Sequence, residues 1–490
     1  MMDSQRALGD AAPASFRDPS GRLFRVGGRV IRIVNETGAP DLRAFLASGT
    51  SQRFVQAGRL VRTDVLNPAA VADDNDEFTS LLHADGSLVL EHERIPFQSF
   101  PYEWPPEMLH AAASLTLDLA DSLLDEGFGL KDATPYNILF RGPDPVFVDL
   151  LSFERRDTGD PTWLPYAQFV RTFLLPLLVN KHFGVSLEQL LMGRRDGIEP
   201  EDVYRLTGVL RRLRPPFLSL VSLPTWLNAR HQADDLSIYR KKVLDNPEKA
   251  RFILDSFFKR LRRALKSLAP ARDRESAWSD YMGLNNNYTD DQFQAKQEFV
   301  HEVIAEFNCQ AVLDVGCNTG HFSVIAAKNG ARVVAIDKDP VVVGETWRRA
   351  GAEGLNILPL VVDLTRPSPP IGWRNRECDG FLSRARGAFD GLFMLAVTHH
   401  MLVSERIPLD EIVDVANELT TNVLVVEFIG PADSMFRRLA RGRDHLFADL
   451  TTELFETSFR RKFEMIRSQR LEGASRWLYL FRKRGTPANA

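Results

Sequence analysis

Short apolar runs alternate with helical segments through the C-terminal half of the chain. The runs span residues 311–315, 332–336, 357–362, 391–397 and 423–428. Unbroken β-branched runs separated by helices are typical of a parallel sheet covered on both faces. Two later runs, 463–467 and 476–481, are close enough in sequence to pair as an antiparallel hairpin. The pattern therefore predicts an α/β fold, a doubly wound Rossmann-like sheet with a terminal antiparallel hairpin.

The N-terminal half has a different pattern. Residues 21–33 predict a hairpin that turns at Gly27-Gly28, and 88–91 predicts a further strand. Residues 157–268 are leucine-rich with helical periodicity, and the basic run at 257–266 predicts the solvated face of an amphipathic helix. These elements predict a two-lobed α+β domain.

The predicted domains and segments follow from these changes of pattern. They are a tail at 1–20, a domain at 21–268 with a small lobe at about 21–100 and a helical lobe at about 101–268, a linker at 269–277, a second domain at 278–484, and a tail at 485–490.

Composition narrows the class of protein. The 490 residues are 44% hydrophobic and 26% charged, which argues against a disordered chain. The formal charge of −4 provides no excess of positive charge for nonspecific binding to nucleic acid. None of the three cysteines forms a CxxC pair, which fits a reducing compartment. The strongest apolar stretch, 173–179, is far shorter than the roughly 18 residues of a membrane helix. We therefore expect a cytoplasmic protein with no nucleic-acid partner and no membrane span.

Acidic residues and glycines follow the first three apolar runs. The first run leads into the sequence LDVGCNTG, whose small residues allow a ligand to approach the backbone. Its spacing is not the GxGxxG of dinucleotide binding. Asp337 ends the second run, where a carboxylate can accept hydrogen bonds from both ribose hydroxyls, and Asp363 ends the third, placed to meet an adenine edge. Alternatively, these two residues cap the helices that follow.

The sequences LDVGCNTG, VVAIDKDP and VVDLTRP together resemble the motifs of class I S-adenosylmethionine-dependent methyltransferases. The resemblance covers about residues 278–484. It departs from the family at Asn318, which replaces a glycine but tolerates left-handed backbone. The resemblance implies that S-adenosylmethionine contacts Asp314, Gly316, Cys317, Asn318, Gly320, Asp337 and Asp363.

Three residues near the ends of the fourth and fifth runs are candidates for catalysis. Methyl transfer to a hydroxyl requires alignment and removal of a proton. Either His399 or His400 can supply a neutral imidazole there, and the pattern does not distinguish them. Glu427 is a further candidate for the acceptor pocket.

A helix is predicted ahead of the first run. Thr289 and Gln292 have the spacing of a capping box. Tyr288 or Lys296 could then lie near the carboxylate of the cofactor. The alternative is that this helix serves only for capping and packing.

The N-terminal half contains the sequence LKDATPYNILFRGPDPVFVDLLSFE. Asp132, Asn137 and Asp149, with a hairpin between the last two, resemble the catalytic loop of the protein-kinase-like superfamily, which includes the aminoglycoside phosphotransferases. The resemblance implies that Asp132 receives the proton of an acceptor hydroxyl and that Asn137 and Asp149 hold Mg²⁺ beside ATP. No lysine precedes Lys131 to hold the phosphates, so Arg29 or Arg32 would have to replace it.

Three functions remain open. The favoured one is an S-adenosylmethionine-dependent methyltransferase that methylates an oxygen of a small molecule or glycan, with a kinase-like module that is not active. The second is a bifunctional kinase–methyltransferase acting on one polysaccharide or small-molecule acceptor. The third is a noncatalytic scaffold that binds nucleotide or S-adenosylmethionine. The oligomeric state is not readable from the sequence.

Overall fold

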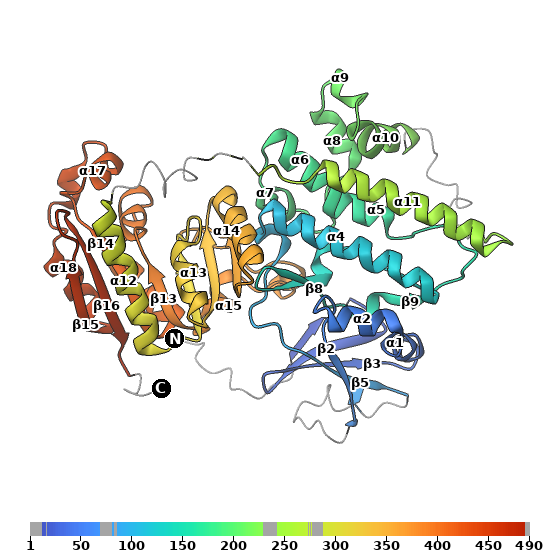
Figure 1. Ribbon diagram of the computed structural model, residues 1–490, viewed down its shortest axis with the longest axis horizontal. Helices are drawn as coiled ribbons and strands as arrows, with labels where there is room; N and C mark the ends of the chain where they lie inside the picture. The colour runs from blue at the N-terminus through green and yellow to red at the C-terminus, as the bar shows by residue number, and fades with distance from the viewer. Residues whose placement is uncertain are drawn as a thin grey trace. The chain divides into compact units, whose positions relative to one another are not determined.

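The computed structural model describes residues 12–15, 17–68, 81–82, 86–228, 243–272, 274, 276 and 288–485. The chain divides into two compact units (Figure 1). The N-terminal unit consists of Met1–Tyr102, Pro106–Pro270 and Gly372–Glu377, and the C-terminal unit consists of Glu103–Pro105, Ala271–Ile371 and Cys378–Ala490. Most of the predicted N-terminal tail, residues 278–287 and residues 486–490 lie outside the described residues.

A sheet of seven strands organises the C-terminal unit. Its strands are β10 (Ala311–Val315), β11 (Arg332–Asp337), β12 (Ile357–Val361), β13 (Phe389–Met394), β14 (Thr420–Ile429), β15 (Phe463–Arg470) and β16 (Arg476–Lys483). They lie in the order β12-β11-β10-β13-β14-β16-β15. The first five are parallel, and β16 is antiparallel to both of its neighbours. The predicted doubly wound sheet and its terminal antiparallel hairpin are confirmed. Strand β13 ends at Met394, three residues before the predicted end.

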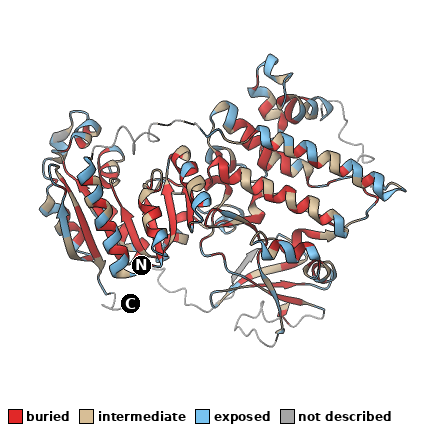
Figure 2. Ribbon diagram, in the orientation of Figure 1, coloured by how far each residue is buried: buried red, intermediate tan, exposed pale blue. Residues whose placement is uncertain are grey.

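Helices connect these strands. They are α12 (Asp290–Phe307), α13 (His321–Lys328), α14 (Pro340–Glu353), α15 (Phe381–Ala385), α16 (Leu409–Leu419), α17 (Ser434–Ala440) and α18 (Thr452–Arg460). Apolar residues of α12, α13 and α14 share one core with alternate strand residues such as Val312 and Val333. Because parallel crossovers are right-handed, reversal of the strand order between β10 and β13 sends the later crossover helix to the opposite face. That reversal opens a crevice at the carboxyl ends of the two strands. Figure 2 shows how far the central strands are buried.

The N-terminal unit combines an antiparallel sheet with helices. The sheet has the order β1 (Ala12–Ser15), β2 (Gly21–Val26), β3 (Arg29–Val34), β5 (Leu88–His92) and β4 (Thr63–Leu66). Two smaller pairs are β6 (Phe128–Leu130) with β9 (Phe153–Arg155) and β7 (Ile138–Arg141) with β8 (Asp144–Phe147). The predicted hairpins at Gly27-Gly28 and between β7 and β8 are confirmed.

The helices of this unit include the predicted amphipathic one. They are α1 (Ala39–Leu46), α2 (Gly49–Gln56), α4 (Pro106–Leu123), α5 (Tyr166–Phe169), α6 (Leu175–Phe183), α7 (Leu187–Leu191), α8 (Pro200–Leu206), α9 (Val209–Arg212), α10 (Leu223–Asn228) and α11 (Pro247–Ser267). Helix α11 contains the basic run and buries Leu254, Phe258, Leu261 and Leu265 along one stripe. Among the helices of the described residues, none has both the length and the low polarity needed to cross a membrane.

Candidate functional site

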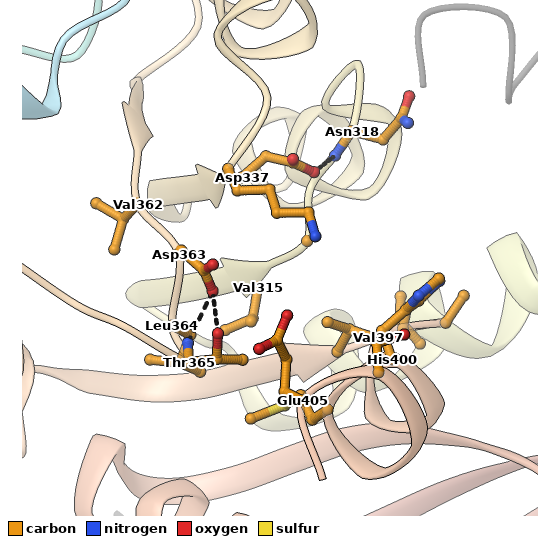
Figure 3. Close-up of a pocket in the computed structure, with 16 residues that line it drawn as sticks. Val315, Asn318, Asp337, Val362, Asp363, Leu364, Thr365, Val397, His400 and Glu405 are labelled. Carbon is orange, nitrogen blue, oxygen red and sulfur yellow. Dashed lines mark hydrogen bonds between the residues drawn. The ribbon is translucent and has the colours of Figure 1, made fainter. Parts of the chain in front are cut away.

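A cavity lies at the carboxyl ends of β10, β11, β12 and β13, where the strand order reverses (Figure 3). Residues from four separate segments line it. The predicted site residues among them are Gly316, Asn318, Asp337, Asp363 and His400. The fold thus brings together predicted site residues that are up to 84 positions apart in sequence, from Gly316 to His400.

The turn after β10 is built from left-handed backbone. Gly316, Asn318 and Gly320 have φ angles of +71°, +49° and +74°. A Cβ atom at Gly320 would lie 2.6 Å from Cγ2 of Thr346, so glycine is required there for close packing as well as for its φ angle. The prediction that Asn318 adopts left-handed backbone is confirmed. The turn keeps bulky side chains away from this part of the cavity wall.

Two carboxylates face the cavity from successive strand ends. Asp337 accepts hydrogen bonds from the backbone amides of Asn318 (3.0 Å, Oδ2) and Asp339 (3.0 Å, Oδ1). Asp363 uses Oδ1 for both bonds from Thr365, at 2.9 Å from its amide and 2.6 Å from its hydroxyl. Burial raises the pKa of Asp337, and its two amide donors oppose that shift. Asp339, rather than Asp337, caps α14 by accepting from the amide of Val341.

These residues fit an adenosine group. Each oxygen of Asp337 is engaged by one amide, and a carboxylate oxygen has room for a further donor such as a ribose hydroxyl. Oδ2 of Asp363 takes part in neither bond from Thr365 and can accept from an amino group. Leu364 and Met401 add apolar surface to the same cavity, which suits a planar base.

Five predicted cofactor contacts lie outside the set that lines this cavity: Asp314, Cys317, Gly320, Tyr288 and Lys296. Asp314 is buried on β10 and accepts a hydrogen bond from the hydroxyl of Ser323, at 2.6 Å. Its burial raises its pKa to about 6. Asp314 therefore ties β10 to α13, and the three predicted carboxylates do not all face one hollow.

The two adjacent histidines occupy different environments. His400 lines the cavity, whereas His399 is buried with only 2% of its surface exposed. Their ring centroids are 4.2 Å apart. Burial lowers the pKa of His400 to about 4 and that of His399 well below its usual value, so both are neutral near pH 7. The structure thus distinguishes two residues that the sequence left equivalent.

A buried ion pair joins α12 to β14. Nζ of Lys296 donates to Oε2 of Glu427 at 2.7 Å, and the hydroxyl of Tyr288 donates to Oε1 at 2.7 Å. Lys296 is 3% exposed and Glu427 is fully buried. Burial lowers the pKa of Lys296, which the neighbouring Glu427 opposes. The predicted capping box of Thr289 and Gln292 at the start of α12 is confirmed. Two further residues, Asp433 and Arg476, are described next. We call them, together with Tyr288, Lys296, Glu427 and His399, the buried charge cluster.

Sequence reasoning missed Arg476 and Asp433. The guanidinium of Arg476 lies 4.3 Å from the ring centroid of Tyr288 and donates through Nε to Asp433 at 2.8 Å. Among the described residues, neither Nη1 of Arg476 nor Nδ1 of His399 has a hydrogen-bond partner, although both atoms are buried. Arg476 opens the strand that pairs with the end of β14, but only the pairing itself reveals that position.

The cavity has further polar lining residues that sequence reasoning missed. They are Lys338, Thr365, Ser404 and Glu405. Lys338 directly follows Asp337, and Thr365 lies two residues after Asp363, so their closeness in sequence to the predicted strand ends was an available signal. Ser404 ends the π-helical turn His400–Ser404, and Glu405 follows it directly. The sequence contains no comparable signal for either residue.

A second group of predicted residues lies in the N-terminal unit. Arg32 on β3 donates through Nη1 to Oδ1 of Asp149 at 2.9 Å and through Nε to Nε2 of His92 at 3.1 Å. Asn137 donates to the hydroxyl of Ser152 at 3.0 Å, and that hydroxyl donates to Oδ2 of Asp149 at 2.8 Å. The structure therefore links Arg32 to Asp149 directly, and Asn137 to Asp149 through the hydroxyl of Ser152.

Asp132 lies beside this group, and Arg29 does not. Oδ1 of Asp132 accepts from Nε2 of Gln168 at 3.3 Å. Burial raises the pKa of Asp132, and the nearby charge of Asp149 adds to the effect. Arg29 instead pairs with Glu91. Because both oxygens of Asp149 already accept hydrogen bonds, a Mg²⁺ ion at Asn137 and Asp149 does not fit this arrangement unless the Arg32 guanidinium moves.

Comparisons with known proteins agree with the geometry of the C-terminal unit. A family model described as "Methyltransferase domain" matches residues 313–418. The nodulation protein NoeA of Rhizobium meliloti (strain 1021) is 30% identical over 473 residues, which cover 96% of this chain and 95% of that protein.

Two solved structures are similar at low scores. The N-methyltransferase NodS from Bradyrhizobium japonicum WM9, in complex with S-adenosyl-L-homocysteine, is 15% identical over 45% of this chain and 97% of its own, with a TM-score of 0.31. The bifunctional kinase–methyltransferase WbdD is 16% identical over 39% of this chain and 40% of its own, with a TM-score of 0.28. At these scores neither structure adds to the assignment.

Proposed function

The chain belongs to the family of the nodulation protein NoeA, and we propose that it methylates a hydroxyl oxygen of a small molecule or a glycan. Its C-terminal unit contains an S-adenosylmethionine-dependent methyltransferase domain. The observation that carries the proposal is the cavity at the strand reversal, where the carboxylates of Asp337 and Asp363 lie with the imidazole of His400.

The cavity residues hold the cofactor in this proposal. S-adenosylmethionine supplies a methyl group that its sulfonium already activates. Asp337 would accept hydrogen bonds from the ribose hydroxyls, and Asp363 from the adenine amino group. Gly316 has no side chain and Asn318 has left-handed backbone, so both leave the backbone of the turn accessible from the cavity.

His400 is the proposed proton acceptor. It lines the cavity, and its lowered pKa, about 4, keeps the ring neutral at pH 7. A neutral imidazole nitrogen can accept the proton of a hydroxyl as its oxygen becomes the nucleophile. Glu427 is less suited to this role because each of its oxygens already accepts a hydrogen bond from Lys296 or Tyr288.

The buried charge cluster adds no net charge to this part of the C-terminal unit. Lys296 is paired with Glu427, and Arg476 with Asp433, so the four charges cancel within the cluster. None of its residues lines the cavity. The acceptor is therefore expected in the cavity itself, beside His400.

Calorimetry with S-adenosylmethionine tests cofactor binding. We expect the wild-type protein to bind, and Asp337→Ala to weaken binding by about tenfold to a hundredfold because charged hydrogen bonds to the ribose are lost. Asp339→Asn is the matched control, since it alters a carboxylate two residues away that caps α14. Failure of the wild type to bind at millimolar cofactor would contradict the proposal.

Turnover tests the chemistry. The protein is incubated with methyl-labelled cofactor and fractions of metabolites and glycans, and mass spectrometry locates the label. We expect a methyl ether whose methyl group carries the label, and we expect His400→Gln to lower turnover by about a hundredfold while leaving cofactor affinity within a few-fold of the wild type. Binding without turnover on any fraction would instead favour the noncatalytic scaffold.

The linked residues of the N-terminal unit favour a second candidate function, the bifunctional enzyme. Arg32 on β3 lies within reach of Asp149, so a small-lobe cation stands near the proposed loop, and its pairing with Asp149 would have to break before Mg²⁺ could bind there. We then expect turnover dependent on ATP and Mg²⁺ that Asp132→Ala abolishes. No binding of ATP by the wild type, with or without Mg²⁺, would eliminate this candidate.

A further inference from the structure

Three short helices of the N-terminal unit expose large apolar side chains. Seven residues from the end of α8 to the end of α10 are between 37% and 78% exposed: Leu206, Val209, Leu210, Leu213, Leu223, Trp226 and Leu227. We call these residues, with the arginines between them, the α8–α10 surface. Single exposed leucines are ordinary, but so many within one short segment mark an interaction surface. Figure 2 shows that most of α9 is exposed.

The α8–α10 surface is held in place by contacts on its inner side. Nε1 of Trp226 donates to the hydroxyl of Tyr204 at 3.1 Å, which joins α10 to α8. The hydroxyl of Ser222 donates to the carbonyl of Arg212 at 2.8 Å. The guanidinium of Arg212 lies 3.8 Å from the ring centroid of Tyr204. These contacts fix the helices while leaving the apolar side chains outside.

The charge of this segment differs from that of the whole chain. Residues 203–228 contain four arginines and no acidic residue, whereas the chain as a whole carries −4. Arg211 and Arg214 are exposed, and Arg205 is paired with Asp202. Glu201, in the first turn of α8, accepts a hydrogen bond from Asn228. The surface is therefore apolar and basic at once.

We propose that the α8–α10 surface docks on an anionic lipid bilayer. Leucines and Trp226 would enter the headgroup boundary while Arg211 and Arg214 meet lipid phosphates, the composition of a helix that lies in the membrane interface. A second copy of this chain is a poorer partner, because a symmetric contact would place this arginine-rich segment against an identical one. The proposal does not depend on the methyl-transfer reaction.

Vesicle sedimentation with the full chain tests the proposal. We expect the protein to bind vesicles containing about one third phosphatidylglycerol, to bind phosphatidylcholine vesicles at least about tenfold more weakly, and to lose affinity as salt rises. Leu210→Asp and Arg214→Glu should each weaken binding by about tenfold. Leu210 is 78% exposed, so its variant is expected to fold.

The matched control is Leu454→Asp, which places the same change on α18, where Leu454 is 44% exposed. It should bind anionic vesicles as the wild type does. No binding of the wild type to anionic vesicles, or equal binding by Leu210→Asp, overturns the proposal. Light scattering that shows a dimer abolished by Leu210→Asp would assign the surface to self-association instead.

Discussion

At the residue scale, side chains that are neighbours in sequence differ because of what surrounds them. His399 and His400 share a peptide bond, yet His399 is buried near the charges of Arg476 and Lys296 whereas His400 lines the cavity. Removal of a proton by histidine requires a neutral imidazole that reaches the acceptor, and only a histidine that lines the cavity meets the second condition.

The pKa of His400 makes stability depend on pH. The pKa of His400 in the folded protein is about 4, below the ordinary histidine value of 6.5, so between these values the unfolded chain binds more protons than the folded one. The contribution of neutral His400 is therefore complete above pH 6.5 and is lost as the pH falls toward 4. We expect His400→Gln to reduce the pH slope of the unfolding free energy in this range by about 1 kcal/mol per pH unit.

Urea unfolding at several pH values measures that slope. The control is His445→Gln, because His445 is exposed on the C-terminal unit. It should leave the slope unchanged. Identical slopes for the wild type and His400→Gln would show that His400 does not titrate as its burial requires.

Gly320 is a second residue whose identity the fold requires. Gly320→Ala forces a Cβ to within 2.6 Å of Thr346 at a φ of +74°. We expect a loss of about 2 to 3 kcal/mol of unfolding free energy. Gly330→Ala is the control, since its φ of +94° is also left-handed but no atom lies within 4 Å of the added Cβ. It should cost only about 1 kcal/mol, and equal losses in urea unfolding would refute the steric argument.

At the element scale, α12 is joined to β14 by charge as well as by apolar packing. Lys296 and Glu427 are 131 residues apart and almost fully buried. A buried pair is weak evidence for stability, but removal of one partner leaves an uncompensated charge. We expect Lys296→Met to lower the unfolding free energy by about 3 to 5 kcal/mol, and the double variant with Glu427→Leu to recover most of that loss.

An exposed ion pair gives the comparison. Lys328 and Glu353 lie 2.8 Å apart, with 57% and 34% of their side chains exposed. Lys328→Met should lower the unfolding free energy far less than Lys296→Met does, because water screens the exposed pair. If Lys296→Met proves equally mild in urea unfolding, the buried pair does not constrain α12.

At the scale of the whole molecule, the chain contains two units with separate cores. One core gathers β10, β11 and α12 in the C-terminal unit, and another gathers β2, β3 and β5 in the N-terminal unit. We expect calorimetry to show two unfolding transitions, of which only one shifts upward with S-adenosylmethionine. At a hundredfold excess over Kd the cofactor should add about 2.7 kcal/mol to that unit. Asp337→Ala should lose the shift. A cofactor that moves both transitions equally would contradict this division.

The sequence by itself determined the local features. Nearly unbroken apolar runs identified the parallel strands, because strands buried on both faces contain few polar positions. Turn chemistry identified the glycine bend and the left-handed Asn318, since few residues accept that backbone. Position at a strand end was enough to select Asp337 and Asp363, because parallel strands end at a common edge of the sheet.

Only the tertiary structure decided which of these residues act together. It separated His400 from His399, placed Arg476 and Asp433 beside Tyr288, and directed Asp314 to Ser323 rather than into the cavity. Arg32 reaches Asp149 and Arg29 does not, since residues three apart on a strand point to opposite faces. The physical reason is common to all of them. Partners lie far apart in sequence, and the pairing of strands and the packing of α12 against the sheet determine which side chains meet.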